Sequence, residues 1–280
     1  MVLDAYAKIN LALDVIGKRN DGYHELRMIM QQVNLKDKIT IKERKKDIVI
    51  KCDNPLVPTD ESNLVYKAYE ILKNKFNIDK GIYIEIEKNI PVAAGLAGGS
   101  SNAAAVLKGL NKIWNLNLTD KELMDIAVNI GADVPYCIMG KTALAEGIGE
   151  RLTKLPSFSD KLILLTKPNI EVSTAYVYKN LNFKEIDKRP DVFSIIEAMN
   201  NNDLNFVANN MINVLENVTT KEYSIINEIK QTMVKYNALG SLMSGSGPTV
   251  FGIFDNEKDI KECRDKLKEK FKEVFIAKTL

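Results

Sequence analysis

A glycine-rich stretch of small residues, residues 91–104, constrains what this chain can fold into more than any other feature. The alternating residues 82–87 before it are typical of a half-buried strand, and the apolar spacing after it predicts a helix. Between them lie Gly95, Gly98 and Gly99, and glycine permits positive φ and close backbone approach. Several amides can then converge on one anion at the positive end of the helix dipole. The stretch therefore predicts a phosphate-binding loop.

A plainer interpretation is a tight turn whose serines, Ser100 and Ser101, only cap the helix. Two better-known phosphate motifs do not fit. A dinucleotide fingerprint needs its second glycine where Ala97 stands. The Gly-Lys-Thr tripeptide at residues 140–142 has Pro135 where a P-loop needs its first glycine. If the stretch binds phosphate, it does so as a third kind of nucleotide loop.

Composition narrows the class of protein. The chain has 280 residues, 45% hydrophobic and 27% charged, which is typical of a globular protein with one large or two ordinary domains. A formal net charge of +2 is too small to attract nucleic acid or a membrane by bulk charge. No apolar run reaches transmembrane length, no signal-peptide core is present, and the three cysteines form no C-x-x-C pair. We therefore expect a cytoplasmic protein with no nucleic-acid partner and no membrane partner.

Three polar side chains depart from their local patterns. Lys8 interrupts an apolar strand predicted over residues 5–15, either as a sheet-edge lysine or as a partly buried cation that faces a phosphate. His24, the only histidine, follows Tyr23 in a turn-rich loop and is either structural or recognises a base. Asp133 lies in a proline-stiffened segment, where it either caps the next turn or takes a proton from a hydroxyl. The local patterns leave each pair of alternatives open.

Other patterns predict elements around these residues. Residues 39–42 and 48–51 alternate and predict two strands that pair with each other. Asn63 precedes a helical apolar stripe, either as a cap residue or as a contact to a nucleobase. Apolar residues between 204 and 215 predict one helix. A second glycine loop, residues 242–249, is either a tight hairpin turn or further support for phosphate binding.

Three separated segments resemble the GHMP kinase superfamily, named for galactokinase, homoserine, mevalonate and phosphomevalonate kinases. They are residues 7–11, 91–104 and 243–249, and the resemblance runs in unbroken order from Ala7 to about Phe254. It implies an α+β fold with two domains. The first, over residues 1–153, would be an ATP-binding domain similar to domain 2 of ribosomal protein S5. The second, over residues 154–280, would be a ferredoxin-like substrate-binding domain.

Residues 17–24 and 131–135 resemble the members of this superfamily that act in non-mevalonate isoprenoid biosynthesis. The resemblance implies transfer of the γ-phosphoryl group of ATP, with Mg²⁺, to the C2 hydroxyl of a cytidyl methylerythritol. Asp133 would be the base, and Lys8 would orient it and stabilise the developing negative charge. The alternatives are another small-molecule kinase of the superfamily, or a non-catalytic nucleotide-binding regulator on the same fold. A monomer or a homodimer is expected.

The resemblance also implies the binding residues. The ATP-binding set surrounds the glycine-rich stretch: Asn63, Lys88, Pro91, Ala94, Gly95, Leu96, Ala97, Gly98, Gly99, Ser100 and Ser101. Ser101 is also the expected Mg²⁺ ligand. The substrate-binding set is Asn10, Tyr23, His24, Thr174 and Tyr178. In this set His24 would hydrogen-bond the cytosine, and the two tyrosines would be stacking surfaces.

Overall fold

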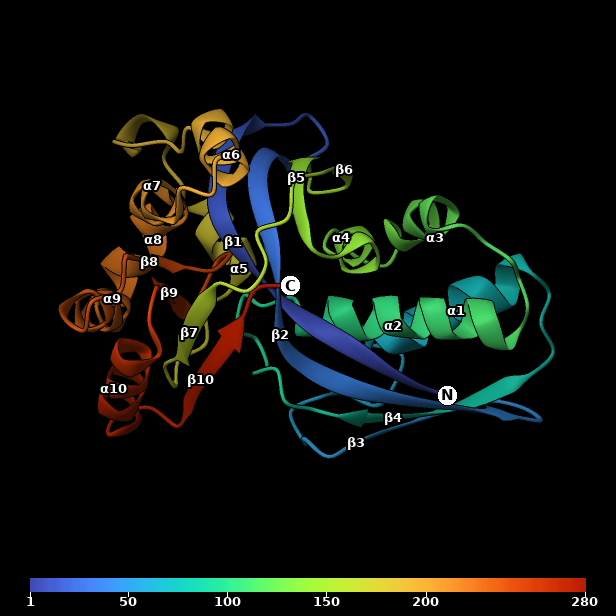
Figure 1. The fold of residues 1–280 in the computed structure, drawn as a ribbon. Coiled ribbons are helices and arrows are strands. Elements are labelled where there is room, and N and C mark those ends of the chain that lie inside the picture. Colours follow the sequence, from blue (N-terminus) through green and yellow to red (C-terminus); the bar gives the residue numbers. More distant parts are fainter. The chain divides into compact units, whose positions relative to one another are not determined.

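The computed structural model describes all residues from Met1 to Leu280 and divides the chain into two compact units (Figure 1). The first unit comprises Met1–Ala7, Leu35–Val92 and Ala97–Gly140, and the second comprises Lys8–Asn34, Ala93–Leu96 and Lys141–Leu280. The two longest strands, β1 (Val2–Lys18) and β2 (His24–Arg44), pair with each other and contribute residues to both units. No helix of the chain combines the length and the apolar character that crossing a membrane requires.

The first unit is a sheet covered by helices. β4 (Gly81–Glu87) lies between β2, its antiparallel neighbour, and β3 (Ile48–Cys52), its parallel neighbour. The buried isoleucines of β4 alternate with more exposed residues, which puts the apolar side chains on one face. Helices α1 (Leu64–Lys75) and α2 (Gly98–Ile113) lie side by side over the sheet, and α3 (Asp120–Ala127) and α4 (Val134–Met139) follow (Figure 1). Because α2 is buried along most of its length, packing fixes the position of its N-terminus.

Polar and aromatic contacts fix the ends of these helices. The Asn63 side chain caps α1 by accepting a hydrogen bond from the Val65 amide at 2.9 Å. Thr119 caps α3 in a complete capping box with Glu122. At the end of α2, the ring of Trp114, the only tryptophan, lies 6.0 Å from the ring of Tyr69 in α1. The N-termini of α1 and α3 therefore carry side-chain caps.

The second unit contains a four-stranded antiparallel sheet in the order β10-β7-β9-β8. Its strands are β7 (Leu162–Lys167), β8 (Gly240–Met243), β9 (Val250–Phe254) and β10 (Glu273–Lys278). Helix α9 (Ile225–Lys235) precedes β8, and α10 (Glu257–Lys268) connects β9 with β10 (Figure 1). This β-α-β-β-α-β order is that of a ferredoxin-like domain, so the predicted class of this fold is confirmed.

Shorter elements complete the second unit. β5 (Thr142–Gly147) pairs with the first half of β2 and forms a hairpin with β6 (Arg151–Lys154). The segment between β7 and α9 holds α5 (Thr174–Lys179), the 3-10 helix η1 (Phe183–Glu185), α6 (Val192–Asn200), α7 (Leu204–Asn210) and α8 (Glu216–Glu222).

Two expectations about the elements were wrong. Residues 39–42 and 48–51 do not pair with each other, because β4 lies between them and the crossover helix α1 allows β3 to run parallel to β4. The helix predicted through residue 215 ends at Asn210. Beyond it the chain pairs with β1, where Leu13 donates its amide to the Ile212 carbonyl at 2.9 Å and accepts from the Val214 amide at 3.0 Å. Long-range backbone pairing thus overrides a local helical pattern.

Candidate active site

The backbone of the glycine-rich loop has the geometry of an anion cradle. Positive φ recurs at every second residue: 50° at Ala93, 73° at Gly95 and 55° at Ala97. Such alternation turns successive amides toward a common centre. The first amide bonded within α2 is that of Ser101, which donates to the Ala97 carbonyl at 2.8 Å. The helical amides before it point out of the N-terminus, where the dipole favours negative charge.

The serines of this loop do not cap the helix. The N-cap position belongs to Ala97, which has no side-chain cap bond. The hydroxyl of Ser101 donates instead to the Tyr6 carbonyl at 2.5 Å, and its side chain is buried. Ser100 is partly exposed in the first turn. The interpretation of this stretch as a serine-capped turn is therefore wrong.

The first glycine loop packs directly on the second within the second unit. The Ser244 hydroxyl donates to the Gly95 carbonyl at 3.0 Å. A Cβ at Gly95 would lie 2.3 Å from the Ser244 carbonyl oxygen, a distance that no side chain tolerates. Pro91, Ala94 and Leu96 are buried, so any contact of these residues with a bound anion would come from the backbone rather than from the side chains. The two glycine loops, which are far apart in the sequence, are therefore in direct contact.

Lys8 lies beside both loops. Its amide donates to the Leu96 carbonyl at 3.1 Å, and its Nζ lies 3.5 Å from the position a Cβ would take at Gly245. Nζ also donates to Oδ1 of Asn10 at 2.7 Å, and both side chains are buried. A lysine that protects a sheet edge is solvent-exposed, whereas Lys8 is 5% exposed. The structure therefore favours the interpretation of Lys8 as a buried cation.

His24 belongs to a group of three aromatic rings in the second unit. Its ring centroid lies 5.2 Å from that of Tyr178 and 6.2 Å from that of Phe183. Partial burial, with a smaller contribution from the Lys18 charge, lowers the pKa of His24 below its usual value of 6.5. Tyr23 is 59% exposed. A neutral imidazole among aromatic rings presents one donor and one acceptor, as recognition of a flat base requires.

Thr174, the first residue of α5, connects this group with the second glycine loop. Its hydroxyl is 2.7 Å from the hydroxyl of Ser246. Four residues further along α5 is Tyr178, so this one short helix carries two of the five predicted substrate residues. The second unit therefore brings Asn10, His24, Thr174 and Tyr178 onto elements that adjoin the two loops.

Asp133 stands at the N-cap position of α4, but its side chain makes no cap hydrogen bond. It is partly buried, and Val134 and Pro135 follow it into the helix. The capping interpretation of Asp133 therefore finds no support in the structure. A carboxylate held by a short buried helix is suited to act as a general base.

Two residues predicted to bind the nucleotide, Asn63 and Lys88, form hydrogen bonds or ion pairs with other residues of the first unit. The Asn63 side chain caps α1 with its oxygen and donates from its nitrogen to the Pro58 carbonyl at 2.6 Å. Lys88 is 4% exposed at its side chain and forms an ion pair of 2.8 Å with Asp37. It also donates to the Ile90 carbonyl. The contacts of Asn63 and Lys88 with a nucleotide stay predictions.

Sequence reasoning missed two residues near these loops. Phe183 completes the aromatic group but lies in a segment without clear periodicity. Asn213 donates to the carbonyls of Met243 at 2.8 Å and Gly245 at 2.7 Å, and so holds the second glycine loop. The sequence contains one indication of Asn213, a single asparagine between apolar residues. It was overlooked because the segment was predicted to be one continuous helix.

The chain matches two family models along its length. Residues 63–141 match the GHMP kinases N terminal domain, and residues 188–273 match the GHMP kinases C terminal domain. A 4-diphosphocytidyl-2-C-methyl-D-erythritol kinase of Clostridium botulinum is 53% identical over 280 residues, which is 100% of both chains. The kinase of the same name from Acetivibrio thermocellus is 53% identical over 278 residues, covering 99% of this chain and 98% of its own.

Solved structures agree with these matches. A crystal structure of 4-(cytidine 5'-diphospho)-2C-methyl-D-erythritol kinase superimposes with a TM-score of 0.85 at 29% identity, covering 100% of this chain and 99% of its own. Homoserine kinase from Cytophaga hutchinsonii shares the fold, with a TM-score of 0.77 at 19% identity over 100% of this chain and 94% of its own. The resemblance found in the sequence is thus confirmed over the full length, and the chain belongs to the GHMP kinases.

Proposed function

We propose that this chain is a kinase that transfers the γ-phosphoryl group of ATP to the C2 hydroxyl of 4-(cytidine 5'-diphospho)-2-C-methyl-D-erythritol. The products are the 2-phosphate and ADP, and the reaction belongs to the non-mevalonate pathway of isoprenoid biosynthesis. The observation that carries the proposal is the full-length similarity, at 53% identity, to kinases named for this substrate. A cytoplasmic location and a monomeric or homodimeric state are part of the same proposal.

The glycine-rich loop is the proposed site of the ATP phosphates. Positive φ at Ala93, Gly95 and Ala97 and the N-terminus of α2 supply the amides that such a group needs. When bound, Mg²⁺ would neutralise negative charge on the phosphates of ATP. Ser101 is the proposed protein ligand, since its hydroxyl oxygen keeps lone pairs after it donates to Tyr6. Ser100, with a partly exposed side chain, is proposed to bind phosphate.

Lys8 and Asp133 are the proposed catalytic residues. Phosphoryl transfer depends on alignment and on neutralising charge more than on covalent chemistry. Asp133 would take the proton of the C2 hydroxyl as that oxygen attacks. Lys8, held by Asn10 beside both glycine loops, would neutralise charge on the transferred group. A tertiary hydroxyl is hindered, so its alignment contributes strongly to the rate.

The aromatic group around His24 supports the proposed cytosine site. A neutral His24 can both donate to and accept from the edge of a base, and the rings of Tyr178 and Phe183 are proposed stacking surfaces together with Tyr23. Asn10 and Thr174 are proposed to hold the diphosphate or the erythritol. Asn63 and Lys88 are the proposed neighbours of the adenine.

The experiment that tests the proposal is ADP release with ATP, Mg²⁺ and a panel of four acceptors: the cytidyl methylerythritol, mevalonate, phosphomevalonate and homoserine. We expect turnover with the cytidyl compound alone. Turnover with another acceptor would keep the phosphate loop and discard the cytosine site. ATP binding without turnover of any acceptor would replace the kinase by a regulator on the same fold.

The general-base role makes a separate prediction. Asp133→Asn should lower kcat by about 100-fold or more, because the attacking hydroxyl loses its proton acceptor. Asp125→Asn on α3, an exposed carboxylate of the same unit, is the matched control and should leave kcat unchanged. Steady-state kinetics with saturating substrates measures both variants. Wild-type turnover in Asp133→Asn would remove Asp133 from the mechanism.

A further inference from the structure

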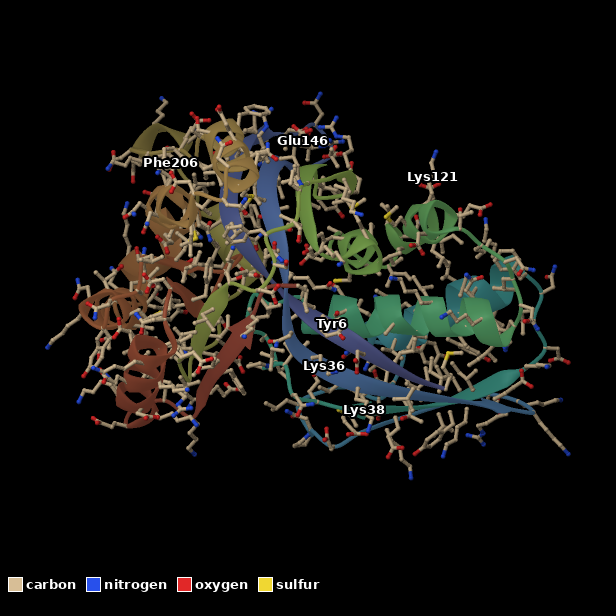
Figure 2. All side chains as sticks on the ribbon, in the orientation of Figure 1. Tyr6, Lys36, Lys38, Lys121, Glu146 and Phe206 are labelled. Carbon is tan, nitrogen blue, oxygen red and sulfur yellow. The ribbon has the colours of Figure 1, made fainter.

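A fully buried carboxylate lies where the pairing of β2 with β4 ends. Asp37 is 0% exposed. The neighbouring side chains of Lys36 and Lys38 are 45% and 48% exposed. Figure 2 labels these two lysines along β2. Alternation along β2 sends Asp37 to the opposite face from these two lysines. The last paired residues of the two strands are Lys38 and Glu87, so Asp37 stands one step beyond the ladder.

Four donors converge on the Asp37 carboxylate. Oδ1 accepts from the amides of Asn89 and Ile90, both at 2.7 Å. Oδ2 accepts from Nζ of Lys88 and from Nδ2 of Asn102, both at 2.8 Å. Beyond the last β2–β4 pair, the Asp37 carboxylate accepts the backbone amides of Asn89 and Ile90, a role that a backbone carbonyl has inside the sheet. Every one of these contacts is internal to the first unit.

The four donors lie at the two ends of the glycine-rich stretch. Residues 88–90 directly precede Pro91, and Asn102 lies early in α2, after the last glycine. Lys88 also donates to the Ile90 carbonyl, and its Nζ lies 3.1 Å from the position a Cβ would take at Gly98. One carboxylate therefore ties the entry of the stretch to the helix that follows it.

We propose that Asp37 is a positioning residue for the nucleotide, which acts through Lys88 and Asn102 by fixing the two ends of the phosphate loop. It touches neither the nucleotide nor the reacting atoms. The inference rests on the proposed function in one respect: it assumes that the anion bound by the loop is ATP. Small displacements of groups that position a reactant have large kinetic effects, so such a residue controls ATP affinity from outside the site.

Whether ATP binding weakens or tightens when Asp37 loses its charge distinguishes a positioning role from simple charge repulsion. A negative charge close to a phosphate site repels the nucleotide, so its removal by charge alone would tighten ATP binding. Asp37→Asn nearly preserves the shape of the side chain but turns an acceptor of four donors into a group with one acceptor and one donor end. The new amide would then oppose Lys88 or Asn102, and the loop would shift. The positioning role predicts weaker ATP binding.

The test is calorimetric titration of ATP and Mg²⁺ into the full chain without acceptor, together with KM for each substrate. Asp37→Asn should weaken ATP binding and raise KM for ATP by about 10-fold or more. KM for the cytidyl substrate should change less than about twofold, because its proposed residues belong to the second unit, whereas Asp37 and its four donors belong to the first. Asp14→Asn is the matched control: Asp14 is also buried, and Arg189 donates to it. It should leave ATP affinity unchanged.

A second variant covers the case in which Asp37→Asn does not fold, as judged by circular dichroism. Asn102→Ala removes one donor and keeps the ion pair of Asp37 with Lys88, and it should shift ATP affinity in the same direction. Unchanged or tighter ATP binding in the folded variants would overturn the inference. Loss of ATP binding in Asp37→Asn, when the wild type binds ATP but phosphorylates none of the four acceptors, would retain the inference and overturn the proposed function.

Discussion

At the scale of single residues, Gly95 shows how a missing side chain lets two loops meet. The 2.3 Å that would separate a Cβ from the Ser244 carbonyl oxygen excludes any other residue, and the φ of 73° would add backbone strain. Gly95→Ala should be strongly destabilising, since positive φ alone costs an alanine roughly 1–2 kcal/mol before the overlap is counted. Denaturant unfolding measures the change.

Gly17→Ala is the control for this substitution, because no atom lies within 4 Å of a Cβ there and φ is not positive. It should leave the free energy of unfolding nearly unchanged. Equal stability of Gly95→Ala and the wild type would mean that the two loops do not approach each other as closely as described.

The sequence identified the unusual residues but not their partners. Lys8, His24 and Asp133 stand out because each interrupts a local pattern. The burial of Lys8 and the ring contacts of His24 depend on residues more than a hundred positions away, which no local pattern reports. The pairing of Lys88 with Asp37, 51 positions apart, is likewise not reported by any local pattern. The resemblance to a family, rather than the residue patterns, supplied the predicted roles.

At the scale of elements, variants of Asn63 can distinguish its role as the cap of α1 from the proposed contact with a nucleobase. Asn63→Ala removes the cap of α1 and should lower stability by about 1 kcal/mol. Asn63→Ser keeps a capping oxygen but loses the amide nitrogen that donates to Pro58. It should restore most of the stability.

The KM for ATP then decides the role of Asn63. An unchanged KM in Asn63→Ser would leave the residue a helix cap only. A raised KM with near-wild-type stability would support the proposed contact with adenine. Thermal unfolding and initial rates on the same preparations give both quantities.

Elements with a strong local period were predictable, and their pairing was not. The alternation of β4 and the capping box of α3 agree with the sequence because both are local signals. The insertion of β4 between β2 and β3 is a non-local choice that the alternating patterns of all three strands allow equally. Likewise, the early end of α7 reflects pairing of residues 212–214 with β1, far away in the chain.

At the scale of the whole molecule, His24 couples stability to pH. Its pKa is lowered in the folded state, so between that pKa and 6.5 the unfolded chain binds more protons than the folded one. The contribution of His24 is therefore fully present above about pH 6.5 and is lost as pH falls through the folded pKa. Denaturant midpoints over this range should fall with decreasing pH.

His24→Gln is the comparison for this dependence and should flatten that part of the profile. Because the chain has one histidine, NMR titration of its ring signals reads the folded pKa without ambiguity. A folded pKa at or above 6.5 would contradict the effect of burial.

The fold class was predictable because the order of the motifs along the chain is specific to one superfamily. The composition of each unit was not, since each gathers three separate segments of the chain. Hydrophobic periodicity describes neighbours in sequence and carries no information about which distant segments share a core.

The placement of two rare residues gives each unit its own built-in reporter. The lone tryptophan, packed on Tyr69, is an intrinsic fluorophore of the first unit, and the lone histidine is an isolated magnetic-resonance signal in the second. Melting can therefore be followed in each unit of the unlabelled, unmodified chain. Coincidence of the two signals tests whether the chain loses its structure in one cooperative step or in two.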